Sequence, residues 1–179
     1  MSARRWCATL ASALVLTAPA CAVTATGGMP RCEPSQRLGI VAQSVPGAAY
    51  LPCIAELPPG WSFESFDVDD DGTRLSLRSD RADRPVDVEL AASCDVRSAT
   101  PVAPRDEGVR TYQLSASVSP RYAGRFYDVF ADGCVTYEFD FARGPHITLI
   151  DELQRAVQLY PRRLLRQELR DRLSITLDP

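Results

Sequence analysis

Hydrophobic and polar residues alternate over two stretches of the chain, residues 86–94 (VDVELAASC) and 134–142 (CVTYEFDFA). Because successive side chains of a β-strand point to opposite faces, this alternation predicts strands with one buried and one solvated face. The apolar face of the second stretch consists of Val135, Tyr137, Phe139 and Phe141, opposite Thr136, Glu138 and Asp140. The pattern predicts an antiparallel sheet that is covered on one side.

Turn residues separate the other strand-like stretches. Asp132-Gly133 stands directly before the second alternating stretch, and Asp-Gly between alternating strands is a strong hairpin signal. Residues 69–72 (DDDG) favour a second turn of this kind. The remaining expected strands are 61–66 (WSFESF), 73–79 (TRLSLRS), 125–130 (RFYDVF) and 110–118 (RTYQLSASV), the last with Tyr112, Leu114, Ala116 and Val118 facing the core.

The C-terminal part of the chain changes to a helical period. A helix is expected after Gly144-Pro145, because residues 147–157 carry apolar side chains at helical spacing, namely Ile147, Ile150, Leu153 and Val157. Pro161 ends this helix and opens a second one, in which Leu165, Leu169 and Leu173 recur every fourth residue. Residues 31–59 are expected to form an ordered but irregular segment, held by Cys32 and Cys53. The sequence thus predicts an α+β domain, an antiparallel meander of about six strands packed by two C-terminal helices.

Residues 1–20 have the composition of a signal peptide. Arg4 and Arg5 precede an uncharged apolar run, and Ala18-Pro19-Ala20 supplies the small residues that signal peptidase requires. An uncleaved signal anchor is an alternative, because no charge occurs between residues 6 and 30. The apolar run is, however, shorter than the ~20 residues that a spanning helix needs.

Cys21 directly follows the predicted cleavage site and is a candidate lipid-attachment residue. A lipobox usually has Leu three residues before the cysteine, and Ala18 occupies that place. Residues 21–30 are then a tether, and residues 31–179 form one disulfide-bearing α+β domain. We expect a protein outside the cytoplasm, either anchored in the membrane through a lipidated Cys21 or secreted.

The cysteine count supports lipidation. Cys7 lies in the signal peptide, and if Cys21 carries lipid, an even set remains: Cys32, Cys53, Cys94 and Cys134. An even set suits an oxidising compartment. We favour the pairs Cys32–Cys53 and Cys94–Cys134 among the possible connectivities, although alternation places Cys94 on the apolar face of its strand and Cys134 on the polar face. Zinc is disfavoured, because the four cysteines lack the closely spaced pairs of a structural zinc site.

Charge and composition exclude some functions. The formal net charge is −3, and loss of Arg4 and Arg5 with the signal peptide leaves 18 basic against 23 acidic residues, or −5. An acidic domain repels phosphate backbones, so nucleic-acid binding is not expected. All 20 basic residues are arginine and no asparagine occurs, which indicates a GC-rich genome rather than guanidinium chemistry.

Three features of the sequence resemble functional sites, but each is better explained by a structural or surface role. Residues 67–72 (DVDDDG) match the start of a calcium loop, but Arg78 stands where the bidentate glutamate should be. His146 is the only histidine, and no G-x-S-x-G accompanies it, so a Ser-His-Asp triad is not expected. The arginines of the last helix could touch anionic headgroups, but residues 145–179 hold six arginines and five acids, which favours an ordinary surface. No cofactor is expected.

Several short motifs resemble a family of uncharacterised exported proteins from high-GC actinobacteria. The motifs are IVAQSVP (40–46), LPC (51–53), LPPGW (57–61), SDRA (79–82) and GCVTYEFDF (133–141). The resemblance covers most of the chain after residue 38. It implies export, and it implies no activity and no site residues.

The sequence favours a non-catalytic envelope module that binds an envelope protein, a lipid or a wall component. The alternative is an envelope hydrolase that uses surface carboxylates such as Glu89 and Glu138, since paired carboxylates can drive glycoside hydrolysis. A pocket lined by these carboxylates would favour the enzyme. An apolar patch near Trp61 or Tyr122 would favour binding.

Overall fold

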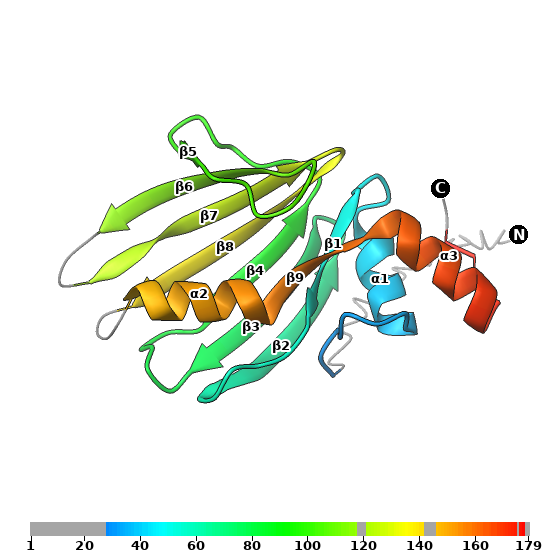
Figure 1. Cartoon of the computed structure of the whole chain (residues 1–179), viewed down its shortest axis with the longest axis horizontal. Helices are drawn as coiled ribbons and strands as arrows, with labels where there is room; N and C mark the ends of the chain where they lie inside the picture. Colours follow the sequence, from blue (N-terminus) through cyan, green and yellow to red (C-terminus); the bar gives the residue numbers. More distant parts are fainter. Residues whose placement is uncertain (1–27, 118–120, 142–145, 175, 178–179) are drawn as a thin grey trace, which may run out of the picture.

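The structure, a computed structural model, describes residues 28–117, 121–141, 146–174 and 176–177 (Figure 1). The predicted signal peptide and Cys21 lie outside these residues. The elements in chain order are α1 (Gln36–Ser44), β1 (Tyr50–Ile54), β2 (Trp61–Asp69), β3 (Gly72–Ser79), β4 (Val86–Ala91), β5 (Thr100–Val102), β6 (Arg110–Ser117), β7 (Tyr122–Phe130), β8 (Gly133–Phe141), α2 (His146–Ala156), β9 (Val157–Pro161) and α3 (Arg162–Leu173).

Seven strands form one antiparallel sheet in the order β2-β3-β4-β8-β7-β6-β5, and β1 pairs with β9 in a separate two-stranded sheet. The predicted α+β class with a large antiparallel sheet is confirmed. The simple meander is wrong at one step, because β4 pairs with β8 and places Asp87 opposite Glu138. Strands β4 and β8, whose apolar and polar residues alternate most regularly, thereby lie at the centre of the sheet, where burial is greatest. The short, exposed β5 forms one edge.

One face of the large sheet, here called the inner face, carries the core. Its fully or almost fully buried side chains include Leu75, Leu77, Val86, Val88, Leu90, Val135, Tyr137, Phe139 and Phe141. Helix α2 runs across this side of the sheet (Figure 1) and buries Leu149 and Leu153 completely or nearly so. Burial of each such side chain contributes about 1.5–3 kcal/mol to folding.

The first C-terminal helix ends earlier than its apolar spacing predicts. Val157 is the first residue of β9, where it pairs with Ile54 of β1. The open edge of β1 offers backbone hydrogen bonds to this β-branched residue, so the chain leaves the helix after Ala156. Ile147, expected on the apolar face, is 80% exposed.

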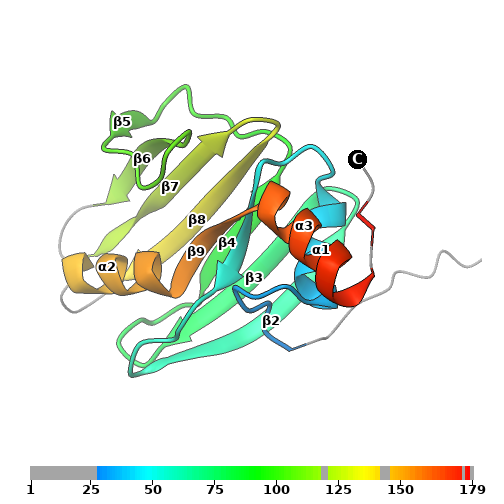
Figure 2. The same cartoon turned by 45° about the vertical axis from the view of Figure 1, so that its right-hand side comes forward.

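Residues 31–59 are ordered as predicted, but they are less irregular than the sequence suggests, because they contain α1 and β1. The side chain of Ser35 caps α1 by accepting a hydrogen bond from the backbone N–H of Leu38 at 3.3 Å. Leu38 is fully buried. Helix α3 packs on α1 (Figure 2), and a Cβ at Gly39 would lie 3.7 Å from a methyl group of Leu169. The three elements α1, α3 and the β1–β9 pair form the end of the molecule beside the large sheet.

The orientation of β6 differs from the sequence expectation. Tyr112 lies opposite Tyr127, and Leu114 lies opposite Arg125. Directly paired residues share a face, and Arg125 in turn pairs with Glu138, so Tyr112 and Leu114 point to the outer face. The residues of β6 on the inner face are polar: Thr111, Gln113 and Ser115.

The four cysteines of the domain lie at disulfide-bonding distance in two pairs. The Cα atoms of Cys32 and Cys53 are 5.0 Å apart, and those of Cys94 and Cys134 are 5.9 Å apart. Strand β4 ends at Ala91, which pairs with Cys134. Cys94 therefore lies beyond the strand end, where strand alternation no longer fixes its direction, and this removes the conflict between the expected faces.

We expect the double substitution Cys94→Ala and Cys134→Ala to lower the free energy of unfolding by about 4 kcal/mol, because the bond closes a loop with a sequence separation of 40 residues. Urea unfolding followed by tryptophan fluorescence measures the change. Cys32→Ala with Cys53→Ala, which opens a separation of 21 residues, should cost slightly less, about 3 kcal/mol. Unchanged unfolding in the first variant would show that the bond does not form.

Candidate functional site

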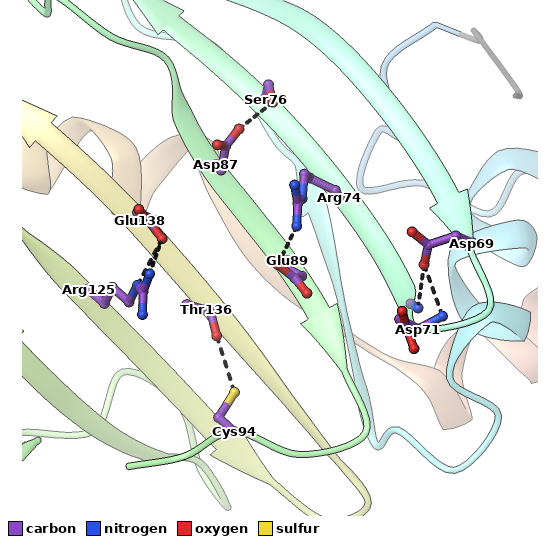
Figure 3. Close-up of polar contacts among 11 residues, drawn as sticks. Asp69, Asp71, Arg74, Ser76, Asp87, Glu89, Cys94, Arg125, Thr136 and Glu138 are labelled. Carbon is purple, nitrogen blue, oxygen red and sulfur yellow. Dashed lines mark hydrogen bonds and ion pairs between the residues drawn. The ribbon is translucent and has the colours of Figure 1, made fainter. Parts of the chain in front are cut away.

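The solvated face of the large sheet, here called the outer face, holds the two carboxylates that the sequence singled out (Figure 3). Glu89 lies on β4 and Glu138 on the neighbouring β8. They are offset by two positions in the register, since Glu138 lies opposite Asp87 and Glu89 lies opposite Thr136. The alternation of these strands, read from the sequence, places both side chains on one surface.

Each carboxylate forms an ion pair with an arginine of an adjacent strand. Arg74 on β3 donates from Nη2 to Glu89 Oε2 at 3.0 Å, and Arg125 on β7 donates from Nε to Glu138 Oε2 at 2.8 Å (Figure 3). The hydrogen bond and charge of Glu89 raise the pKa of Arg74, and the hydrogen bond of Glu138 has the same effect on the pKa of Arg125.

This arrangement does not suit general acid–base catalysis. A catalytic carboxyl needs a proton affinity raised by burial or by a second carboxylate. The side chains of Glu89 and Glu138 are 41% and 57% exposed, and each is neutralised by its arginine. The outer face instead exposes paired positive and negative charges in fixed positions.

Two neighbouring depressions meet at Glu138. The first has a volume of about 210 Å³ and is lined by Arg74, Asp87, Glu89, Thr136 and Glu138. The second, about 320 Å³, is lined by Leu114, Ala116, Ala123, Gly124, Arg125, Glu138, Phe139 and Asp140. Leu114, whose outward direction the sequence did not predict, and Ala116 supply the β6 part of the apolar lining of the second depression, and Ala123 of β7 and Phe139 of β8 contribute the rest. The Arg125–Glu138 pair stands where the two depressions adjoin.

The calcium-like motif forms the β2–β3 turn. Asp69 Oδ1 accepts hydrogen bonds from the backbone N–H groups of Asp71 and Gly72 at 3.0 and 3.1 Å (Figure 3). Gly72 has φ of +148°, and a Cβ there would lie 1.9 Å from the carbonyl oxygen of Leu90. The Asp69 carboxylate thus stabilises the turn. No three acidic, histidine or cysteine side chains in the described part of the chain are placed to hold a metal ion.

A buried ion pair on the inner face escaped the sequence analysis. Asp128 of β7 is fully buried, with Arg105 Nη1 at 3.2 Å from its Oδ2 and Thr111 Oγ1 donating to its Oδ1 at 2.8 Å. Burial raises the pKa of Asp128, although the charge of Arg105 and the bond from Thr111 act in the opposite direction. Arg105 lies in a proline-containing loop without a periodic pattern of apolar residues, so the local sequence does not predict its contact with Asp128.

The same guanidinium reaches the C-terminal end of α2. Arg105 Nη2 donates to the carbonyl oxygens of Gln154 and Val157 at 2.6 and 3.0 Å. Its carbon Cζ lies 5.5 Å from the centre of the Tyr137 ring. Burial, together with the nearby Asp128 charge, raises the pKa of the Tyr137 hydroxyl far above its ordinary value. These groups are enclosed by the core, so we assign them to stability.

Helix α2 is tied to β2 by a second group of polar contacts. Trp61 Nε1 donates to Glu152 Oε2 at 2.7 Å, and Arg81 Nη2 donates to the same oxygen at 2.5 Å. Burial acts to raise the pKa of Glu152, but these two hydrogen bonds and the Arg81 charge hold it below its ordinary value. Trp61 is only 7% exposed, so it does not form the surface patch that would have favoured binding.

Tyr122 and His146 also belong to the packing of the inner face. The Tyr122 ring stacks on Phe139 with 5.2 Å between centroids and lies 5.6 Å from the imidazole of His146. Gln113 donates to the Tyr122 hydroxyl at 2.7 Å. The structure thus places His146 beside aromatic rings at the start of α2.

No family model, curated protein or solved structure matches this chain. Among the described residues, no helix has the length and apolar character needed to cross a membrane.

We predict that the stability of the protein relative to an Asp128→Asn variant decreases as the pH rises from the ordinary aspartate pKa of about 3.9 towards neutrality. The raised pKa means that folded Asp128 binds its proton more tightly than the unfolded chain does. The stabilisation is therefore complete below the unfolded pKa and is lost as the pH passes through the folded pKa. Urea unfolding of both proteins across this range measures it, and a difference that grows with pH would contradict the assignment.

Proposed function

We propose that this protein is an exported cell-envelope domain, anchored through a lipidated Cys21, that binds another envelope component through its outer face. The two cysteine pairs at disulfide distance are consistent with a location outside the cytoplasm.

The pairing of opposite charges across the outer face carries this proposal. Three arginine–carboxylate contacts span neighbouring strands, namely Glu64–Arg78, Arg74–Glu89 and Arg125–Glu138, and a fourth joins Asp140 of β8 to Arg121, the residue before β7. Exposed ion pairs of this kind add little to stability, typically about 0–1 kcal/mol each. They do hold charges in a defined pattern, which a partner with complementary charges and hydrogen-bonding groups can recognise.

The partner that suits this surface is polar. The depressions beside Glu138 combine carboxylate and guanidinium groups with the small apolar contribution of Leu114 and two alanines. A wall glycan or a hydrophilic envelope protein can form further hydrogen bonds with such groups, whereas lipid acyl chains would remove them from water and offer no hydrogen bonds in return. We therefore place wall components and envelope proteins ahead of lipid as occupants of the outer face.

An envelope hydrolase is the second candidate, because Glu89 and Glu138 line the same depression. Two carboxylates on one cavity wall are the minimum that glycoside hydrolysis requires. The neutralising arginines and the exposure of both glutamates favour binding over this reaction.

The anchor is tested by intact mass spectrometry of the protein purified from membranes and from the medium of its native host. We expect a membrane-bound form whose mass equals residues 21–179 plus a lipid modification that contains diacylglycerol. Reduction should add four hydrogen atoms, two for each disulfide. An unmodified chain starting at residue 21 and found only in the medium would refute the anchor and leave Cys21 as an unpaired thiol.

Binding through the outer face is tested by cosedimentation of the mature protein with purified cell-wall sacculi and, separately, with host membranes. We expect the double variant Arg125→Ala and Glu138→Ala to bind about tenfold more weakly than the parent, a loss of about 1.4 kcal/mol. The matched control is Asp95→Ala with Arg97→Ala, which removes an exposed ion pair of 2.6 Å outside the sheet and leaves the net charge equal.

Two outcomes separate the candidate functions. Equal binding by the parent, the outer-face variant and the control would refute recognition through this surface. Release of soluble wall fragments by the parent, abolished in a Glu138→Gln variant, would establish the hydrolase instead.

A further inference from the structure

A cavity lined by three arginines lies outside the large sheet and shares no lining residue with the outer-face depressions. Its volume is about 260 Å³, and we call it the arginine pocket; its lining residues are Ala49, Tyr50, Pro161, Arg162, Arg163 and Arg166. It forms where the β1–β9 pair leads into α3, because Tyr50 is paired with Pro161 in the register of the small sheet. Among the described residues, no carboxylate contributes to the lining.

Arg162 fixes one wall of the pocket. It is 5% exposed, and its Nη1 donates to the carbonyl oxygens of Ala42 and Val45 at the end of α1. Burial and the neighbouring charge of Arg166 both lower the pKa of Arg162. The guanidinium groups of Arg162 and Arg166 are thus close enough to repel each other, and Arg162 is largely shielded from water.

The other two arginines have no carboxylate partner among the described residues. Among the described residues neither Arg163 nor Arg166 forms an ion pair. The Nε atom of Arg166 is buried and has no hydrogen-bond partner in the described structure. A buried N–H group without an acceptor costs free energy that a bound acceptor would recover.

The backbone adds further positive potential. The pocket adjoins the N-terminus of α3, a helix of 12 residues with no acidic residue in its first turn and no side-chain cap. The helix dipole places partial positive charge there, which favours a bound anion. Further along α3, Arg172 lies 3.7 Å from Glu168, whereas Arg163 and Arg166 at the pocket have no such carboxylate among the described residues.

We propose that the arginine pocket binds a phosphate group, carried either by an anionic lipid headgroup or by a free phosphate compound. Guanidinium groups bind phosphate through paired N–H···O bonds, and Arg163 and Arg166 both offer such donors to the cavity. Leu164, which follows Arg163 in the first turn of α3, is 42% exposed. This inference is independent of the outer-face proposal, since the two sites share no residue.

The test uses the mature chain with Cys21→Ser, so that a covalent lipid cannot contribute to membrane binding. Inorganic phosphate is titrated at constant ionic strength, with chemical shifts of Tyr50 and of the α3 backbone amides as the readout. Separately, the protein is sedimented with phosphatidylcholine vesicles that do or do not contain phosphatidylglycerol. The pocket variant is Arg163→Gln with Arg166→Gln, and the control is Arg170→Gln with Arg172→Gln, which makes the same charge change on the same helix.

We expect the pocket variant to bind at least one of the two probes at least tenfold more weakly, and the control to change by less than twofold. Saturable phosphate binding without vesicle binding identifies a free phosphate compound as the ligand. Vesicle binding that requires phosphatidylglycerol and is lost in the pocket variant identifies a lipid headgroup. The proposal is overturned if neither probe binds, or if the control weakens binding as much as the pocket variant, which is the behaviour of general charge attraction.

Discussion

The carboxylate of Asp128 lies completely buried within the inner face of the large sheet, where its only charged contact within the described structure is Arg105. Removing two charges from water costs several kcal/mol per ion, so such a pair persists only when its hydrogen bonds are complete. Thr111 supplies the remaining bond to Asp128, while the carbonyls of Gln154 and Val157 occupy the second nitrogen of Arg105. A single guanidinium therefore joins the loop before β6, strand β7, and the junction of α2 with β9.

This pair also explains why β6 turns its polar side inward. A buried carboxylate requires a hydrogen-bond donor from the adjacent strand, and Thr111 is the residue opposite Asp128. With Thr111 directed inward, Tyr112 and Leu114 must point outward. The β6 part of the apolar lining of the outer depression is thus a consequence of how the core satisfies one buried charge.

The two candidate sites differ in the state of their charges. On the outer face, arginines and carboxylates neutralise each other across the strands, so the surface offers a pattern of both signs without a strong net field. In the arginine pocket, Arg163 and Arg166 face a cavity without any carboxylate among its lining residues. The first arrangement suits a polar partner that spreads over a surface, and the second suits one compact anion.

Alternation along residues 86–94 and 134–142 was enough to predict the antiparallel sheet and the solvated position of Glu89 and Glu138, because side-chain direction in a strand repeats every two residues. Other features depend on contacts between distant residues. The β4–β8 pairing, the helix α1 and the end of α2 at Ala156 are decided by which edges and apolar surfaces meet in the folded chain. The arginine pocket is of this kind, because only the β1–β9 pairing brings Tyr50 beside the start of α3. Local periodicity does not predict such long-range contacts. The residues around Arg105 and Asp128 accordingly show no pattern that would indicate their ion pair.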